Sequence, residues 1–200
     1  MVSATEIVRL QDGLTREWHG PADAERDEPL PTPPAPGGKL SGADKSPAAA
    51  VSRGGAGDWL SLVARQHRAN FDLWHIEDEA RTPGASDAEI ADVKRRIDRT
   101  NQLRNDLMEE LDRAMQSWVE ERGVPNPAAP LNSESPGFMI DRLSILALKI
   151  YHTREEAERR DAPPGHTERN RERLKTLPGV SMLCGRRHLA AHGASRFTAS

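Results

Sequence analysis

The segment NFDLWHIEDEAR, residues 70–81, places an imidazole and several carboxylates within a few helical turns. An imidazole and a carboxylate three residues apart converge on one helix face, so His75 and Asp78, with Glu77 beside them, have the donor types of a metal site. The segment lacks the Glu-x-x-His pairs that di-metal helical bundles repeat on two helices. We therefore prefer a surface cluster of ion pairs around an aromatic anchor. No metal is assigned, and the cofactor is left unknown.

A second polar group interrupts an otherwise apolar helical stripe at Asn101, Arg104 and Asn105, in the string NQLRND. Arginine flanked by amides is suited to binding a phosphate or a carboxylate. A buried guanidinium without a partner is costly, so Asp78 and Asp141 are expected to hold the arginines in place. The same residues could equally form a satisfied network that fixes the register of the helices, and both interpretations stay open.

A third candidate is the string NSESPG, residues 132–137, which has the features of a helix N-terminus. Ser135 followed by Pro136 is a typical pair of N-cap and first-turn residues. The free N–H groups of such a terminus attract anions, Gly137 allows close approach, and Arg142 lies further inside the helix. These are the features of an anion site, but ordinary N-capping accounts for Ser135 and Pro136 without any ligand, and both interpretations stay open.

Residues for proton transfer are less clearly marked. His75, His152 and Lys149 are candidates for general acid or base roles, although a lysine on a helix commonly extends to solvent. The sequence has no glycine-rich phosphate loop, no GxSxG motif and no paired-histidine zinc motif, and its single cysteine, Cys184, lies in no nucleophile context. The better-marked enzyme classes are thereby excluded, and enzymatic activity stays undecided.

Helical periodicity and end signals predict the elements that must position these residues. Ser3 with Glu6, and Ser86 with Glu89, have capping-box spacing. No alternating run of β-branched residues predicts a strand. The fold class is therefore all-α, a bundle of about four helices in which the last long helix, apolar on most sides, is central. The expected helices cover residues 3–19, 58–82, 86–121 and 135–160, with a shorter one at 167–177.

Composition divides the chain into four parts. The hydrophobic fraction of 36% is low for a chain folded throughout, and the Pro/Gly-rich stretch has no apolar period. We expect an amphipathic helix that packs on the bundle at 1–19, a disordered insertion at 20–57, the helical bundle core at 58–160, and a short helix with an irregular basic tail at 161–200.

Charge and hydropathy limit the partners and the location. A net charge of −3 gives no strong nucleic-acid signal. No segment approaches the roughly 18 consecutive apolar residues of a membrane span, and the N-terminus lacks the pattern of a signal peptide. One cysteine excludes an intramolecular disulfide and fits a reducing compartment. The sequence therefore predicts a soluble, cytoplasmic protein without a membrane span.

Three blocks, NFDLWHIEDEAR, IDRTNQLRND and LNSESPGFMIDRLSILALKIYHTREEAER, resemble the signature of a bacterial family, domain of unknown function 4254. The resemblance covers about residues 58–160. It implies a cytoplasmic, helical bacterial protein without an established activity, with some members encoded near glycan-synthesis genes. The Pro/Gly-rich stretch looks like an insertion relative to that family, and after about residue 174 the chain diverges from the helical ending of similar proteins.

Two functions follow as hypotheses. The first is binding of an anionic small molecule, phosphate- or nucleotide-sugar-like, in a polar pocket between helices. Its expected ligand-binding residues are Asn101, Arg104, Asn105, Ser135, Gly137 and Arg142. The alternative is a non-catalytic scaffold or homo-oligomerisation module, with the polar stripe as a structural network and Trp18 and Trp59 as docking surface. Whether the stripe lines a cleft or closes on itself distinguishes the two.

Overall fold

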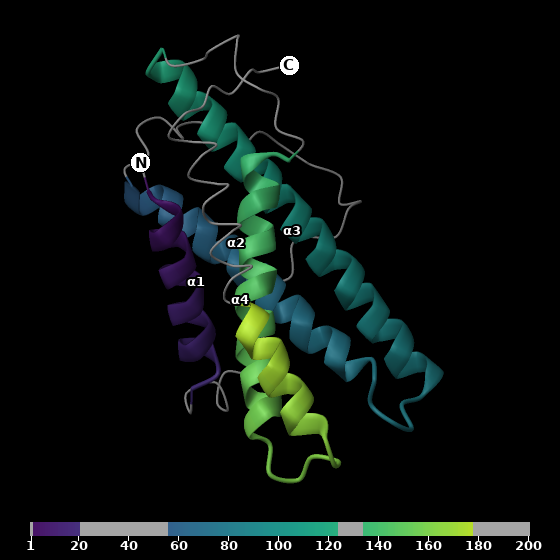
Figure 1. Ribbon diagram of the computed structural model, residues 1–200. Coiled ribbons are helices and arrows are strands. Elements are labelled where there is room, and N and C mark those ends of the chain that lie inside the picture. Colours follow the sequence, from purple (N-terminus) through teal and green to yellow (C-terminus); the bar gives the residue numbers. More distant parts are fainter. Residues whose placement is uncertain (1, 21–55, 124–133, 178–200) are drawn as a thin grey trace.

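The structure, a computed structural model, describes residues 2–20, 56–123 and 134–177. Within these residues it is helical and contains no strand, so the predicted all-α class is confirmed. The predicted insertion at 20–57 and the predicted irregular tail lie almost entirely outside the described residues. The helices are α1 (Ala4–Trp18), α2 (Ala56–Glu79), α3 (Asp87–Glu121) and α4 (Pro136–Glu158), and a further helical segment covers residues 166–177 (Figure 1).

Three of the helices begin at the serine caps that the sequence predicts. The hydroxyl of Ser3 accepts from the Glu6 backbone N–H at 3.3 Å, and the Glu6 carboxylate accepts from the Ser3 backbone N–H at 2.7 Å. Ser86 and Glu89 repeat this capping box at the start of α3, and Ser135 caps α4. Each cap pairs backbone donors that the first helical turn leaves open. The helix starts are therefore set locally.

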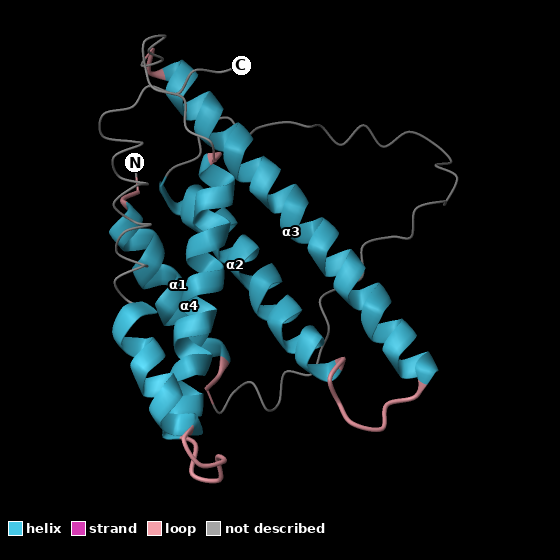
Figure 2. Cartoon of the chain, turned by 45° about the vertical axis from the view of Figure 1, so that its right-hand side comes forward, coloured by secondary structure: helices cyan, strands magenta, loops and turns pink. Residues whose placement is uncertain are grey.

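The central helix is α4, which packs against α1, α2 and α3. The helices α2 and α3 form an antiparallel pair, joined by a short loop that turns at Gly84 with a φ of 84° (Figure 2). The helix α1 lies beside α4 and runs in the same direction, while residues 166–177 lie along the C-terminal half of α4 (Figure 1). This arrangement brings the C-terminal halves of α1, α2 and α4 together.

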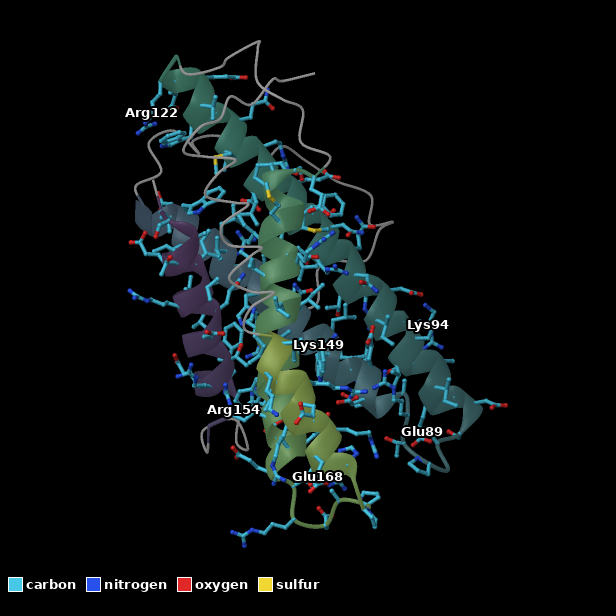
Figure 3. All side chains as sticks on the ribbon, in the orientation of Figure 1. Glu89, Lys94, Arg122, Lys149, Arg154 and Glu168 are labelled. Carbon is cyan, nitrogen blue, oxygen red and sulfur yellow. The ribbon has the colours of Figure 1, made fainter. Side chains whose placement is uncertain are left out.

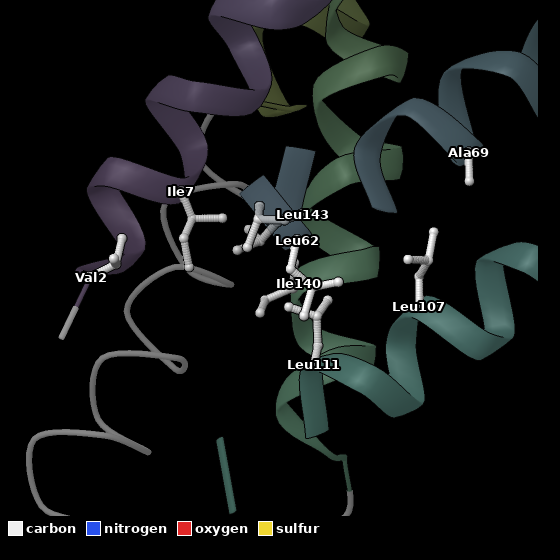
Figure 4. Packing of buried hydrophobic residues seen from close by; sticks show 9 residues of the cluster. Val2, Ile7, Leu62, Ala69, Leu107, Leu111, Ile140 and Leu143 are labelled. Atoms are coloured by element: carbon white, nitrogen blue, oxygen red, sulfur yellow. The ribbon is translucent and has the colours of Figure 1, made fainter. Parts of the chain in front are cut away.

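The apolar core lies where the four helices meet (Figure 4). Ile7 of α1, Leu111 of α3 and Ile140 of α4 are 0% exposed, and they pack in one cluster with Leu62 and Leu143. Burial of one such side chain stabilises the fold by about 2 kcal/mol. Because every helix contributes to this cluster, the core fixes their relative positions.

The buried face of α1 is more polar than its apolar period suggests. The row of apolar residues begins with a buried Ile7, but Leu10, Leu14 and Trp18 are only half-buried. Gln11 and Thr15 are fully buried instead, and Gln11 Nε2 donates to the backbone carbonyl of Ile140 at 3.2 Å. These polar residues face the bundle because partners for them lie there. The buried residues of α1 are Ala4, Ile7, Gln11 and Thr15.

The helices α3 and α4 approach each other closely at Gly137. A Cβ atom at this position would collide with the backbone carbonyl oxygen of Met108, so only glycine fits without a shift of one helix. The close approach also lets the Gly137 backbone N–H donate to Asp112 Oδ1 at 2.7 Å. Glycine is thus required here by the helix contact.

Gly137→Ala is expected to lower the free energy of unfolding by about 1–3 kcal/mol, because the new methyl group overpacks the interface. Urea denaturation measures this change. Gly13→Ala is the matched control, since a Cβ at this α1 position has no atom within 4 Å. Alanine there is expected to stabilise by up to about 1 kcal/mol. Equal losses at the two glycines would contradict the contact at Gly137.

Charged side chains such as Lys94, Lys149 and Arg154 project from the outer faces of the helices (Figure 3). Lys149, a sequence candidate for proton transfer, is exposed. Among the described helices, none combines the length and the apolar character needed to cross a bilayer. The candidate functional residues are therefore sought among the polar groups inside the bundle.

Candidate functional site

The polar stripe of α2 and α3 closes on one carboxylate, Asp141 of α4, which is 3% exposed. Arg104 donates from Nε to Asp141 Oδ1 at 2.7 Å and from Nη2 to Oδ2 at 2.5 Å. Gln66 and Asn70 donate to the same Oδ1 at 2.7 and 2.9 Å. Of the two expected partners, Asp78 and Asp141, it is Asp141 that pairs with Arg104 in the structure.

In this network the Arg104 guanidinium donates to Asp141, although sequence analysis gave Arg104 as a candidate for binding a ligand. The hydrogen bond to Asp141 raises the pKa of the Arg104 guanidinium, against the effect of burial. Of the flanking amides, Asn101 is half-buried and Asn105 is exposed. Because Arg104 bonds inward, the geometry favours the interpretation of the stripe as a structural network that fixes helix register.

A chain of hydrogen bonds continues from this network to α1 through His67, which is 0% exposed. Asn70 donates to Ser144 Oγ at 2.9 Å, and Thr15 donates to the Gln11 carbonyl at 2.8 Å. The Ser144 hydroxyl is then free to donate to His67 Nδ1 (2.7 Å), and His67 Nε2–H donates to Thr15 Oγ1 (2.9 Å). The chain therefore suits a neutral imidazole, and burial lowers the pKa of His67 to about 4.

Stability is expected to fall as the pH drops from 6.5 towards 4, because the unfolded chain protonates His67 in this range while the folded chain does not. The loss amounts to about 3 kcal/mol and levels off below the folded pKa. Urea denaturation between pH 7.5 and pH 4.5 measures it. In His67→Gln the fall should be smaller by that amount, whereas parallel pH profiles for the two proteins would contradict the assignment.

At the start of α4, where the sequence suggests an anion site, a carboxylate of the protein itself accepts the hydrogen bonds that an anion would accept. Asp112 of α3 accepts from Ser135 Oγ at 2.6 Å and from the Gly137 backbone N–H at 2.7 Å. Arg142 is exposed and pairs with Glu134. A carboxylate on another helix cannot be inferred from spacing within NSESPG. The terminus is therefore capped from within the protein.

The carboxylates next to His75 also differ from their expected roles. Asp78 pairs with Arg81 at 2.9 Å on the surface, and it does not hold an arginine of the stripe. Glu77 is exposed as well. Both belong to a solvated helix end, as the preferred interpretation of this segment has it. Because Glu77 and Asp78 are both exposed, their positions give no support for a metal site formed by His75, Glu77 and Asp78.

A different cluster forms near the C-terminal ends of α1, α2 and α4, where His19, His75 and His152 meet. One ring nitrogen of each histidine lies within 4.8 Å of a ring nitrogen of each of the other two. All three side chains are half-buried. Sequence analysis gives His75 and His152 as separate candidates for proton transfer. The fold brings both of them together with His19.

The outer nitrogen of each imidazole is already bonded. His19 Nδ1 lies 2.7 Å from the Thr15 carbonyl, and His75 Nδ1 lies 2.8 Å from the Phe71 carbonyl. Carbonyl oxygens accept only, so each Nδ1 carries the proton and each Nε2 offers a lone pair. His152 follows the same pattern, with Nδ1 at 2.8 Å from a carboxylate oxygen of Glu155.

Two of the inner nitrogens have no partner. Nε2 of His19 and Nε2 of His152 are buried and make no hydrogen bond within the described part of the chain. Buried polar atoms without partners are uncommon, and each calls for an explanation such as a bound ion or water. Lone pairs that converge from three helices are suited to a metal ion.

Aromatic rings hold the imidazoles in place. Trp74 stacks on His152 with ring centroids 4.8 Å apart and planes 7° from parallel, and Tyr151 stacks on His19 at 4.1 Å. Burial lowers the pKa of His152, opposed by its bond to Glu155. The neutral form, which a metal requires, is therefore favoured.

The dimensions of the cluster are close to those of a metal centre. Three nitrogens bound tetrahedrally to Zn²⁺ at 2.0–2.1 Å lie about 3.4 Å apart. The nitrogens here lie within 4.8 Å of one another, so metal binding requires the imidazoles to move closer together than they are in this structure. Imidazole nitrogen suits Zn²⁺, Cu²⁺ and Ni²⁺, whereas Mg²⁺ and Ca²⁺ prefer oxygen.

The fold and the cluster define an all-α bundle with a half-buried three-histidine site between α1, α2 and α4. The chain belongs to the family described as Protein of unknown function (DUF4254), whose family model matches residues 60–179. The match contains His75 and His152, while His19 precedes it. Comparisons with curated proteins and with solved structures gave no match.

Sequence reasoning missed His19, Glu155 and Asp112. For His19 a signal was present, because Gln11, Thr15 and His19 follow one another at four-residue intervals and share one helix face. A polar row of this kind on an amphipathic helix indicates polar partners in the bundle. Nothing in the local spacing indicates that those partners include His75 and His152.

Proposed function

We propose that this protein is a metal-dependent binding protein in which His19, His75 and His152 hold a divalent transition metal. The observation that carries the proposal is the pair of buried Nε2 atoms without partners, on rings whose Nδ1 atoms are already bonded. A carbonyl or carboxylate on the far nitrogen is the usual second-shell partner of a metal-bound histidine. Each ring of the cluster has one.

Three protein ligands leave a coordination position for a further molecule. Structural zinc sites are usually closed by four protein ligands, whereas catalytic sites keep an open position for water or substrate. Three neutral imidazoles also leave the full charge of the ion in place, which makes an anion the favoured fourth ligand. The anion expected from the sequence is thus proposed at the metal, and not at Arg104 or Arg142.

The ligand class that we propose is phosphate- or nucleotide-sugar-like. This choice rests on the family resemblance, which implies a bacterial, cytoplasmic protein connected with glycan synthesis. A phosphate oxygen is a suitable fourth ligand for a metal that also serves as a Lewis acid. Addition of inorganic phosphate to the Co²⁺-loaded protein should change its visible absorption, and an unchanged spectrum would remove the anion from the proposal.

A competition titration with Zn²⁺ and a chromophoric chelator tests the metal itself. The wild-type chain should bind one equivalent, and His75→Ala should weaken binding by at least about 100-fold, more than a second-shell change costs. His166→Ala is the matched control, because His166 pairs with Glu156 outside the cluster. Equal affinities of the wild type and His75→Ala would contradict the proposal.

Glu155→Gln is expected to weaken Zn²⁺ binding by about 10- to 100-fold, because the carboxylate that orients His152 Nδ1–H and increases the basicity of Nε2 is lost. Glutamine still offers an oxygen acceptor, so the ring keeps its orientation. The same titration measures the change. The matched control, Glu168→Gln, alters a carboxylate on the segment 166–177, and an effect of similar size there would indicate a general loss of negative charge.

A further inference from the structure

The proposed metal centre is divided between two parts of the chain. His75 and His152 lie inside the segment that the family model matches, residues 60–179, whereas His19 ends the helix α1 that precedes it. Residues 60–179 alone therefore provide two ligands of the cluster. The third ligand is present only when α1 is docked with its C-terminal end against α2 and α4.

The two halves of α1 are held differently. The buried apolar residues of α1 and its N-terminal flank, Val2, Ala4 and Ile7, all lie at its N-terminal end. In the C-terminal half the fully buried residues are polar, Gln11 and Thr15.

In this half Gln11 Oε1 is buried without a partner in the described part of the protein, and a buried polar atom left without a partner lowers the free energy gained on docking. Trp18 stacks on His67 with ring centroids 5.2 Å apart, and the guanidinium carbon of Arg68 lies 5.1 Å from the centroid of the Trp18 ring, but the indole stays half-buried. The end of α1 that carries His19 is thus held by polar groups and half-buried rings, and not by buried aliphatic side chains.

We infer that metal binding and the docking of the C-terminal half of α1 are coupled, so that α1 regulates the affinity of the metal centre. The inference rests on the proposed function. A metal that bonds His19, His75 and His152 together stabilises the docked position of α1, because it binds that position more tightly than a position in which His19 is withdrawn. Coupling of this kind is reciprocal, so whatever displaces the end of α1 weakens metal binding by the same factor.

Hydrogen exchange of the full-length chain, followed by mass spectrometry with and without Zn²⁺, tests the coupling. Backbone amides at 13–19 should exchange more slowly with Zn²⁺, by a factor between about 5 and 150, the usual range for coupled sites. Amides at 107–115, in the core part of α3, serve as the internal reference and should change less.

His19→Phe is the matched variant, because phenylalanine retains ring contacts to Phe71 and Tyr151 and removes the ligand nitrogen. In this variant Zn²⁺ should no longer slow exchange at 13–19, and Zn²⁺ affinity should fall by at least about 100-fold, beyond the effect of a second-shell change. Circular dichroism confirms that the variant is folded, and His19→Gln replaces it if it is not.

The outcomes separate the inference from the proposed function. Tight Zn²⁺ binding with unchanged exchange at 13–19, and unchanged affinity in His19→Phe, would overturn the coupling while leaving a metal site on α2 and α4. Failure of the wild-type chain to bind Zn²⁺ would overturn both. Binding with slowed exchange that depends on His19 supports both.

Discussion

Asp141→Ala is expected to be among the most destabilising single substitutions in the described bundle, with a loss of about 3–5 kcal/mol in the free energy of unfolding. The substitution removes the carboxylate that accepts from Arg104, Gln66 and Asn70. The guanidinium of Arg104 is left without its partner at 23% side-chain exposure, and the amides of Gln66 and Asn70 stay buried. Urea denaturation followed by circular dichroism measures the loss.

Asp78→Ala is the matched control for Asp141→Ala, since it also removes a carboxylate paired with an arginine. The Asp78–Arg81 pair is exposed, with side chains 57% and 75% accessible, so the loss should be below about 1 kcal/mol. The double variant Asp141→Leu with Arg104→Met should recover part of the stability, because no buried charge is left unpaired. Similar losses in Asp141→Ala and Asp78→Ala would contradict the role of Asp141.

Zn²⁺ is expected to stabilise the folded protein by about 2.7 kcal/mol at a free concentration 100 times its Kd, because the folded chain assembles the three imidazoles and the unfolded chain does not. For a chain of this size the melting temperature should rise by about 5–10 °C. Differential scanning calorimetry measures the shift. Mg²⁺ at the same concentration should give no shift, since it binds oxygen in preference to imidazole nitrogen.

The variant His152→Ala should lose the Zn²⁺-dependent stabilisation and keep its fold in the absence of metal. His166→Ala should respond to Zn²⁺ as the wild type does. A shift that persists in His152→Ala would place the ion elsewhere in the chain. Protons compete with the metal for Nε2, so the stabilisation should also diminish at acidic pH.

Local signals in the sequence account for most of the fold. The caps Ser3, Ser86 and Ser135 stand directly before α1, α3 and α4 in the structure. Capping depends on residues three apart, so it can be recognised without tertiary information. The central position of α4 and the pairing of Arg104 with Asp141 were also predictable, because a helix apolar on most sides must be enclosed and a buried charge needs a partner.

The candidate site could not be predicted because its determinants are contacts between helices. His19 and His75 are 56 residues apart, so no spacing rule connects them. The sequence predicts a helix N-terminus with free N–H groups at Ser135. In the structure Asp112 of α3 accepts hydrogen bonds from Ser135 and from the Gly137 N–H. At Ser135 the short-range capping pattern was recognised and its further partner came from another helix, whereas His19 was missed altogether.

The alternative interpretation is a scaffold or homo-oligomerisation module. The closed network around Asp141 supports it, whereas the positions of the two tryptophans do not. Trp18 stacks on His67 and packs edge-on against Phe71, and Trp59 packs against the core cluster. Both rings thus contribute to packing within the chain. The unpartnered nitrogens of the histidine cluster call for a bound ion or water, and metal binding at this cluster distinguishes the two interpretations.

Titration of the purified chain with Co²⁺, followed by visible absorption, tests the metal centre most directly. The intensity and position of the bands of this ion report its coordination number. The account predicts saturation at one equivalent with the intense bands of a four-coordinate ion, and loss of these bands in His19→Phe, His75→Ala and His152→Ala but not in His166→Ala. A weak spectrum like that of the hydrated ion, or intense bands that survive in all three cluster variants, would contradict a metal centre at His19, His75 and His152.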